Sequence, residues 1–343
     1  MVSSNPETYL KECESNPVNF DMLPEKIKLG QWKRITVAKK GKEKSVMRIV
    51  ESEIEKSTFI DLVITQTTDF KDHSFRVGKQ YNKIKKLKEN LPQHQFIIQM
   101  DFAENYNCKS VKEIQSAYWN QTSVTLHPVV AYYRNTIGEL CHTIYVVVSD
   151  ELGHSSTTVH AFLDILIPEI KLIDPDVDII HYWTDSPTSQ YCNKQIFCTV
   201  ANHQAVYGTK ACWNYFEMGH GKGPCDGLGG MTKRMADQAV RCGKVVIRDA
   251  HDVFQWSMNS NIKGVKFLFV SSDTCKEVSK RLKARTISAV RGTFKLHVVV
   301  GMGSSTVALK ETSCYCEICL NDNLCENPSW IKQDMSLIQN RST

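Results

Sequence analysis

Three aspartates stand where a strand or a helix would deliver a carboxylate. Asp101 follows the apolar run at 95–100, Asp185 ends the run at 178–184, and Asp226 lies in GHGKGPCDGLGG. Such runs predict buried strands. Carboxylates that converge repel one another unless they hold cations, and hard oxygen ligands suit Mg²⁺ or Mn²⁺. We therefore expect a two-ion site that activates a water or a 3′-hydroxyl against a phosphodiester.

The elements that must position these acids follow the order β-β-β-α-β-α-β-α over residues 95–245. The first three strands can pair as antiparallel hairpins, whereas the later two need crossover helices and so run parallel to the first. This order predicts an α/β fold built on a five-stranded mixed sheet with helices on both faces. The first and fourth strands become neighbours, which brings Asp101 and Asp185 to one edge. The predicted elements are strands at 95–101, 123–133, 142–150, 178–186 and 211–219, a helix capped by Ser155 or Ser156, and helices at 189–207 and 231–242.

Three sequence motifs carry a resemblance to a known family. They are MDFAENY at 100–106, HYWTDSPTSQY at 181–191 and FEMGHGKGPCDGLGGMTKR at 216–234. Together with the order of elements, they resemble the ribonuclease H-like catalytic domains of DNA transposases with a DDE or DDD triad, and proteins derived from such transposases. The resemblance covers about residues 95–245.

This resemblance implies roles for individual residues. Asp101 and Asp185 would bridge two divalent ions, and Asp226 would be the third ligand because the motif's helix begins there. Glu217, at the end of the preceding strand, is the alternative third ligand. From the residues alone, His220 either orients a water or the scissile phosphate or is a loop residue without a catalytic role, and Glu104 and Asn105, just past Asp101, are candidates to support it. The residues expected to contact DNA are Lys222, Lys233 and Arg234.

The expected activity is metal-dependent cleavage of DNA, and strand transfer stays open because both reactions use the same triad. Two alternatives share the fold: an inactive transposon-derived protein that binds DNA or protein, and a ribonuclease H-like nuclease. A third is an NTPase built on the glycine-rich loop, although that loop lacks the G-x-x-x-x-G-K-[ST] spacing.

The rest of the 343-residue chain surrounds this region. Residues 1–94 form a basic hairpin and helical region, and residues 246–343 form a small α+β appendage with a cysteine-rich tail. A net charge of +5 and a pI of about 8.5 permit DNA binding without requiring it. The lysines of the leading helix are either a solvated face or a phosphate-contacting face; they are Lys79, Lys83, Lys85, Lys86 and Lys88.

The thirteen cysteines have no disulfide-framework spacing, which suits reduced cysteines in an intracellular protein; a DNA partner would place it in the nucleus. The spacing C-x-C-x₂-C-x₅-C at Cys314, Cys316, Cys319 and Cys325 fits either a Zn²⁺ site or plain thiols. No run reaches the roughly 18 apolar residues of a membrane span, and we expect neither membrane insertion nor a secretory signal. A homo-oligomer stays open.

Overall fold

The computed structural model describes residues 20–39, 42–108, 122–260, 262–283, 287–320, 324–325 and 330–336. The chain divides into two compact units, Met1–Gly78 and Lys79–Thr343. Their border lies inside helix α2 (Lys56–Glu89). The structure therefore divides the chain differently from the three regions predicted, whose borders were near residues 94 and 245.

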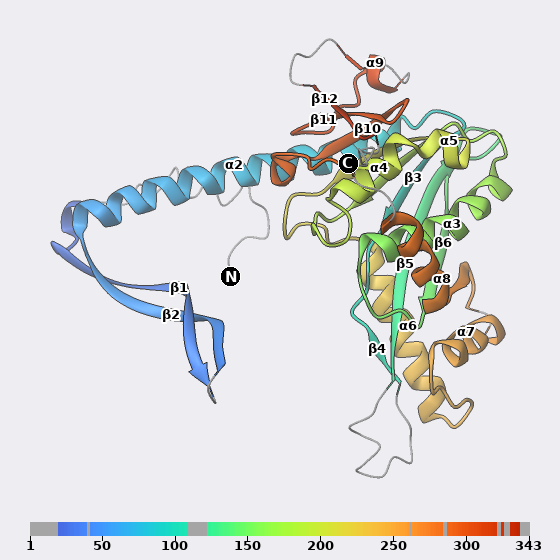
Figure 1. Ribbon diagram of the computed structural model, residues 1–343, viewed down its shortest axis with the longest axis horizontal. Helices are drawn as coiled ribbons and strands as arrows, with labels where there is room; N and C mark the ends of the chain where they lie inside the picture. Colours follow the sequence, from blue (N-terminus) through green and yellow to red (C-terminus); the bar gives the residue numbers. More distant parts are fainter. Residues whose placement is uncertain are drawn as a thin grey trace, which may run out of the picture. The chain divides into compact units, whose positions relative to one another are not determined.

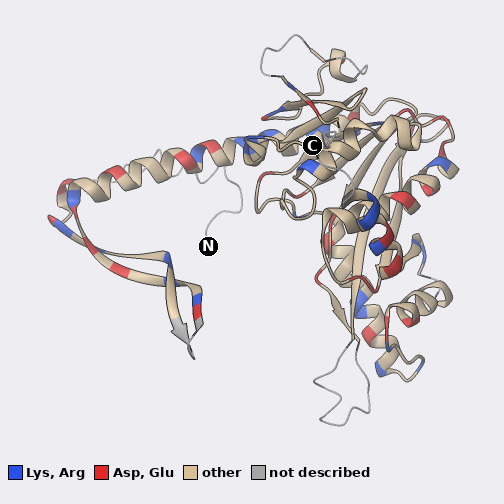
Figure 2. Ribbon diagram, in the orientation of Figure 1, with Lys and Arg blue, Asp and Glu red and all other residues tan. Residues whose placement is uncertain are grey.

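The first unit is dominated by a long two-stranded ribbon. After a short 3-10 helix, η1 (Phe20–Met22), strands β1 (Lys26–Lys39) and β2 (Lys42–Glu55) pair antiparallel along their whole length (Figure 1). Basic and acidic residues are interspersed along both strands (Figure 2). Trp32 is 66% exposed, which indicates that the backbone ladder, more than a core, holds this ribbon together.

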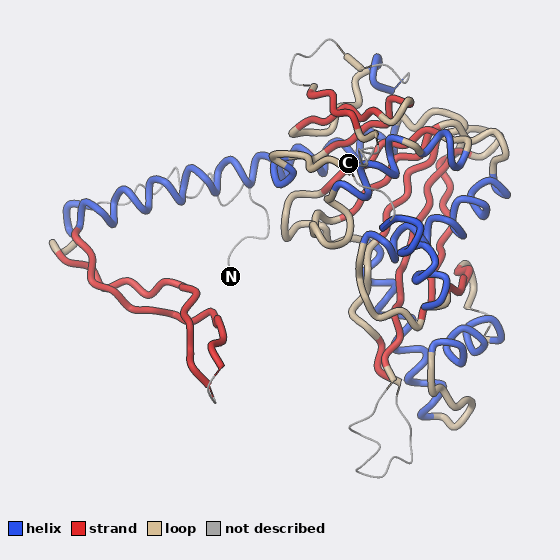
Figure 3. The backbone as a smooth tube through the Cα atoms, in the orientation of Figure 1, coloured by secondary structure: helices blue, strands red, loops and turns tan. Residues whose placement is uncertain are grey.

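The second unit contains one large mixed sheet. Within the described residues it has ten strands, in the order β12-β11-β10-β8-β7-β3-β5-β6-β9 with β4 paired to β5. Figure 3 shows strands in red and helices in blue. β7 is parallel to β3 and β8, whereas β5 is antiparallel to β3 and β6. The strands are β3 (Gln95–Met100), β4 (Tyr106–Asn107), β5 (Ser123–Arg134), β6 (Leu140–Ser149), β7 (Ile179–Thr184), β8 (Lys210–Tyr215), β9 (Val265–Val270), β10 (Val298–Gly303), β11 (Thr306–Lys310) and β12 (Ile331–Asp334).

The five strands predicted from the sequence form the contiguous centre of this sheet, β8-β7-β3-β5-β6. The sheet continues beyond them on both sides. β9 lies parallel to β6, and β10 to β12 extend the sheet antiparallel from β8. The strands predicted for a separate C-terminal appendage therefore belong to the same sheet.

Helices cover both faces of the sheet. On β5, Val129 and Ala131 pack in the core cluster that contains residues of α3 and α4, whereas Val124 and Leu126 pack with α6 and α7. This alternation is the period of two expected when both faces of a strand are buried. The helices are α3 (Ser156–Ile173), α4 (Lys194–Ala201), α5 (His203–Tyr207), α6 (Pro224–Arg241), α7 (Ala250–Asn259), α8 (Ser272–Lys283) and α9 (Glu317–Leu320), with a 3-10 turn η3 (Thr293–Lys295).

Local capping explains two helix boundaries. Ser155 is the N-cap of α3, and its side chain accepts a hydrogen bond from Thr158 N, as predicted. The helix predicted over 189–207 was wrong in its extent. It begins at α4, where the Asn193 side chain accepts from Gln195 N and Ile196 N, and Asn202 separates α4 from α5. Asparagine favours such caps because its side chain competes for backbone hydrogen bonds.

The last part of α2 belongs to the second unit. Ile84 and Leu87 of α2, and Leu91 just beyond it, pack in one cluster with Ile97 and Trp183. The buried Gln80 amide donates to Tyr215 O at 2.8 Å, and its Oε1 accepts from Ser313 N at 3.1 Å. Within the described residues, no helix is both long and apolar enough to cross a membrane.

Truncating Leu87 tests this assignment of α2. Leu87 is fully buried, so Leu87→Ala should lower the free energy of unfolding by about 2–5 kcal/mol through the cavity it leaves. Ile64 lies on the same helix but is 55% exposed, and Ile64→Ala should change stability by less than about 1 kcal/mol. Urea unfolding followed by fluorescence measures both. Equal effects of the two substitutions would contradict the assignment.

Candidate active site

The pairing of β3 with β7 sets the positions of the first two acids. The strands are parallel, and the last registered pair is Gln99 opposite Trp183. Asp101 and Asp185 each lie two residues beyond this pair, so they occupy equivalent positions at the same end of adjacent strands. Neighbouring strands are about 4.8 Å apart. The register therefore brings together two carboxylates that are far apart in the sequence.

Each of these two acids is held by the backbone that follows it. Asp101 Oδ1 accepts from Phe102 N at 2.8 Å, and Asp185 Oδ1 accepts from Ser186 N at 2.9 Å. The Asp101 backbone N–H donates to Pro128 O at 3.3 Å, which ties the end of β3 to β5. Because the two acids make the same kind of local bond, both side chains are oriented before any ligand arrives.

Asp226 comes to this edge on the first turn of α6. Its Oδ2 accepts from Gly223 N at 2.8 Å and so caps the helix. The adjacent Cys225 Sγ lies 3.4 Å from Gln99 O, next to the end of β3. Further along α6, a Cβ at Gly229 would approach the Ala103 Cβ to 2.7 Å, so only glycine allows the helix this close. The start of α6 is thereby packed against the strand that carries Asp101.

The glycine-rich loop lies directly on the second acid. A Cβ at Gly221 would come within 2.7 Å of Asp185 Cβ and 3.2 Å of its Cα. The Tyr81 hydroxyl donates to His220 O at 2.7 Å, with Lys222 O at 3.3 Å. The end of α2 therefore fixes this loop over the acids.

Burial and mutual repulsion perturb the acids. Burial raises the pKa of Asp101 to about 7; the Phe102 N–H opposes the rise, and the charges of Asp185 and Asp226 add to it. Burial also raises the pKa of Asp185, where the Ser186 N–H and the charge of His220 oppose the rise and Asp226 adds to it. The three carboxyl groups thus interact with one another, which is the condition under which a bound cation is most stabilising.

The three acids are more widely spaced than two other groups of possible metal ligands. Among the described residues, two groups of possible ligands have all their donor atoms within 4.8 Å of one another: the quartet of Cys314, Cys316, Cys319 and Cys325, and the surface group His94, Asp174 and Asp176. The three aspartates are not such a group, so their carboxylate oxygens do not all lie within 4.8 Å of one another in the metal-free protein.

The alternative third ligand has another partner. Glu217 is 8% exposed, and its Oε2 lies 2.6 Å from His297 Nε2. This buried pair favours Asp226 over Glu217 as the third acid. The expected supporting residues divide: Asn105 accepts from His154 Nε2 at 2.8 Å and Thr125 Oγ1 at 3.1 Å, whereas Glu104 is exposed.

The residues expected to contact DNA lie on the glycine-rich loop and on α6. Lys222 and Arg234 are exposed and Lys233 is half-buried. Lys233 follows Asp226 by seven residues on α6, about two turns and roughly 10 Å further along the same helix face. A DNA strand whose phosphate backbone passes Asp226 along this helix face would therefore also pass Lys233.

Sequence reasoning missed the residues that hold the site together. Neither Tyr81 nor Cys225 was predicted to have a role in the site. The available signal for Tyr81 was its place among the lysines of the leading helix, because a tyrosine hydroxyl usually finds a hydrogen-bond partner.

The fold and site thus define a mixed α/β protein with an acid cluster at the carboxyl ends of two parallel central strands. A family model described as a domain of unknown function (DUF8701) matches residues 80–313, more than half of the chain, so the chain belongs to this family. Neither a curated protein nor a solved structure matches it.

The raised pKa of Asp101 predicts a site that destabilises the metal-free fold. Below about pH 4, Asp101 is protonated in both the folded and the unfolded chain and contributes nothing. As the pH rises, the unfolded chain ionises first, so stability falls until the pH passes about 7. Asp101→Asn should therefore stabilise the protein at pH 8 by up to about 4 kcal/mol, with little gain near pH 4.

Urea unfolding in a chelator at pH 4.5 to 8 measures this difference. Asp150→Asn is the matched control, because Asp150 also follows a strand, β6, but caps α8 through Ser272 N at 2.6 Å. That substitution should give no gain at pH 8. An Asp101→Asn protein no more stable than the parent at pH 8 would contradict the destabilising effect assigned to the Asp101 carboxylate.

Proposed function

We propose that this protein is a ribonuclease H-like, transposase-related or transposase-derived enzyme that cleaves DNA phosphodiester bonds with divalent metal ions. The observation that carries the proposal is the matched placement of Asp101 and Asp185 beyond the β3–β7 register, with Asp226 on the helix packed against β3. Strand transfer is a further reaction open to the same site.

The central sheet supports the ribonuclease H-like assignment. Its five middle strands run β8-β7-β3-β5-β6, with β5 antiparallel to its neighbours and helices crossing before β7 and β8. This is the arrangement of elements on which the resemblance to transposase catalytic domains rests. The sequence motifs of that resemblance fall at the ends of β3, β7 and β8, where the acids and the glycine-rich loop lie.

The residues present fit the ions that this chemistry needs. Asp101, Asp185 and Asp226 would hold two Mg²⁺ or Mn²⁺ ions through carboxylate oxygens. Bound there, the ions supply activation of a water or a 3′-hydroxyl and stabilisation of the leaving oxygen.

The chain's own residues position the nucleic acid. His220, whose charge acts on Asp185, orients the attacking water or the scissile phosphate. Lys222, Lys233 and Arg234 contact backbone phosphates and set the path of the strand. A DNA substrate implies a nuclear protein.

Neutralising the acids tests catalysis directly. Asp101→Asn and Asp185→Asn should each lower Mn²⁺-dependent nicking of supercoiled plasmid at least about 100-fold, because each removes a charge that holds the ions. DNA binding in a gel-shift assay should remain. Asp150→Asn, at the same sheet edge, should nick like the parent. Nicking that persists in either acid variant contradicts the assignment.

The same assay separates the third-ligand candidates. Asp226→Asn should lower nicking as the other two acids do, whereas Glu217→Gln should mainly lower thermal stability because Glu217 pairs with the buried His297. Failure of the parent to nick under any divalent ion would favour the inactive DNA-binding derivative. Degradation of arbitrary DNA ends would favour a general nuclease.

The basic residues make a separate prediction about affinity. Replacing Lys222, Lys233 or Arg234 with Ala should weaken DNA binding at low salt and lower the slope of log K against log salt by about 1 for each phosphate that the side chain neutralises in the parent. Lys263→Ala, at another exposed lysine, is the control and should leave the slope unchanged. Equal slopes for all four variants would place the DNA elsewhere.

A further inference from the structure

A second group of possible metal ligands lies apart from the carboxylates, and all its ligands are sulfur. The Sγ atoms of Cys314, Cys316, Cys319 and Cys325 lie within 4.8 Å of one another, and Cys314 Sγ is 3.8 Å from Cys325 Sγ. The twelve cysteines that the structure describes are all unbridged. A disulfide would need about 2 Å between the sulfurs, so the contact is not a covalent bond.

These distances match a tetrahedral metal site. Four thiolates about 2.3 Å from a central Zn²⁺ form a tetrahedron whose edges are about 3.8 Å. The Cys314–Cys325 separation equals that edge, and the other pairs lie within 4.8 Å. Mg²⁺ and Mn²⁺ prefer oxygen, whereas four sulfur ligands select zinc or iron.

The local backbone explains how closely spaced cysteines can converge. Leu320 N donates to Cys316 O at 2.9 Å, which forms the turn of α9. Cys316 and Cys319 are three residues apart across this turn and so lie on the same side of it. Cys314 lies two residues before Cys316, and Cys325 lies five residues after the end of α9.

We propose that Cys314, Cys316, Cys319 and Cys325 bind one Zn²⁺ ion in a closed structural site. All four tetrahedral positions are supplied by the protein, so no position remains for a substrate or a water, and the ion has no catalytic role. Its function is to hold the segment between β11 and β12 in place.

The described residues beside the cysteines are packed unevenly. Tyr315 and Leu320 pack against the core cluster that contains Trp183, whereas Ile318, between them, is 50% exposed. The described cysteines are unbridged, so a metal ion is the link that their spacing fits.

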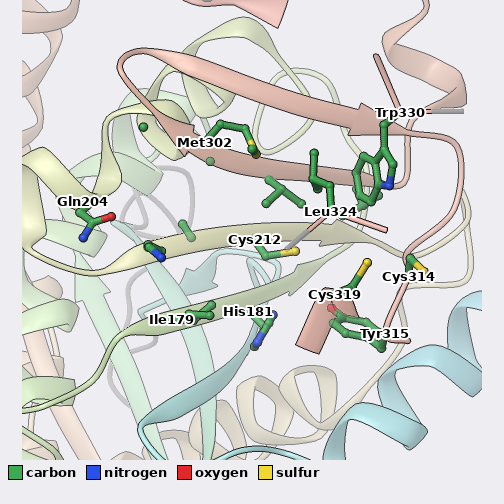
Figure 4. Close-up of a pocket in the computed structure, with 16 residues that line it drawn as sticks. Ile179, His181, Gln204, Cys212, Met302, Cys314, Tyr315, Cys319, Leu324 and Trp330 are labelled. Carbon is green, nitrogen blue, oxygen red and sulfur yellow. The ribbon is translucent and has the colours of Figure 1, made fainter. Parts of the chain in front are cut away.

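The same segment forms one wall of a cavity of about 210 Å³. Cys314, Cys319 and Trp330 line it on the segment's side, and Figure 4 shows Trp330 across the cavity from His181 and Ile179 of β7. A zinc ion that fixes the cysteines therefore also keeps this cavity covered.

Metal analysis of the full chain tests the proposal. Protein purified from zinc-supplemented cells should contain about one zinc per chain. Cys316→Ser should contain less than about a tenth of that, whereas Cys316→His should keep it because imidazole also binds zinc. Cys242→Ser, at an exposed cysteine outside the cluster, is the control and should retain full zinc.

Cobalt substitution of the parent provides a second measurement that needs no variant. Co²⁺ at four thiolates should give strong sulfur-to-metal charge-transfer absorption that added Zn²⁺ abolishes. Zinc-free protein, iron in place of zinc, or a Cys316→Ser protein with full zinc overturns the proposal. Asp101→Asn should keep its zinc, so this test fails or succeeds independently of DNA cleavage.

Discussion

The parallel register between β3 and β7 is the constraint on which the candidate site depends. It is fixed because Phe96, Ile98 and Met100 must face the core shared with α3, while Ile97 faces the cluster formed with the end of α2. A slip of one residue would turn every side chain of β3 to the opposite face. The core therefore decides which residue ends the strand next to Asp185, and packing far from the acids sets the geometry of the acids.

This placement works against stability. Asp101 and Asp185 are half-buried at the end of the sheet, where desolvation and neighbouring carboxylates raise their pKa values and so disfavour their ionised forms. Backbone N–H groups from Phe102 and Ser186 offset only part of that effect. Fully buried aromatic side chains on the neighbouring strands, Trp183 and Trp213, supply the apolar burial that a strained site needs. Such tension between a site and its fold is common where function requires converging charges.

Features that depend on short stretches of sequence could be predicted, whereas contacts between distant segments could not. The central strands and the two acids that end them follow from short apolar runs, and the register then brings Asp101 and Asp185 together. The partners of β9 and β10 could not be predicted, because an apolar strand does not specify which edge it joins. The bonds from Tyr81 to the glycine-rich loop depend equally on a tertiary approach between segments far apart in the sequence.

The C-terminal strands also support the loop that carries His220 and leads into α6 and Asp226. His297, just before β10, pairs with Glu217 at the base of that loop, and its carbonyl accepts from Tyr215 N at 3.0 Å. Ser313, which directly precedes the cysteine segment, donates to Asn214 Oδ1 at 2.8 Å. Residues that lead into the cysteine quartet therefore hydrogen-bond to β8, and the carboxyl end of β8 leads to the candidate site. The loop is therefore held at its base by Glu217 and His297 and further along by the Tyr81 hydroxyl, and these contacts lead the chain into α6 and Asp226.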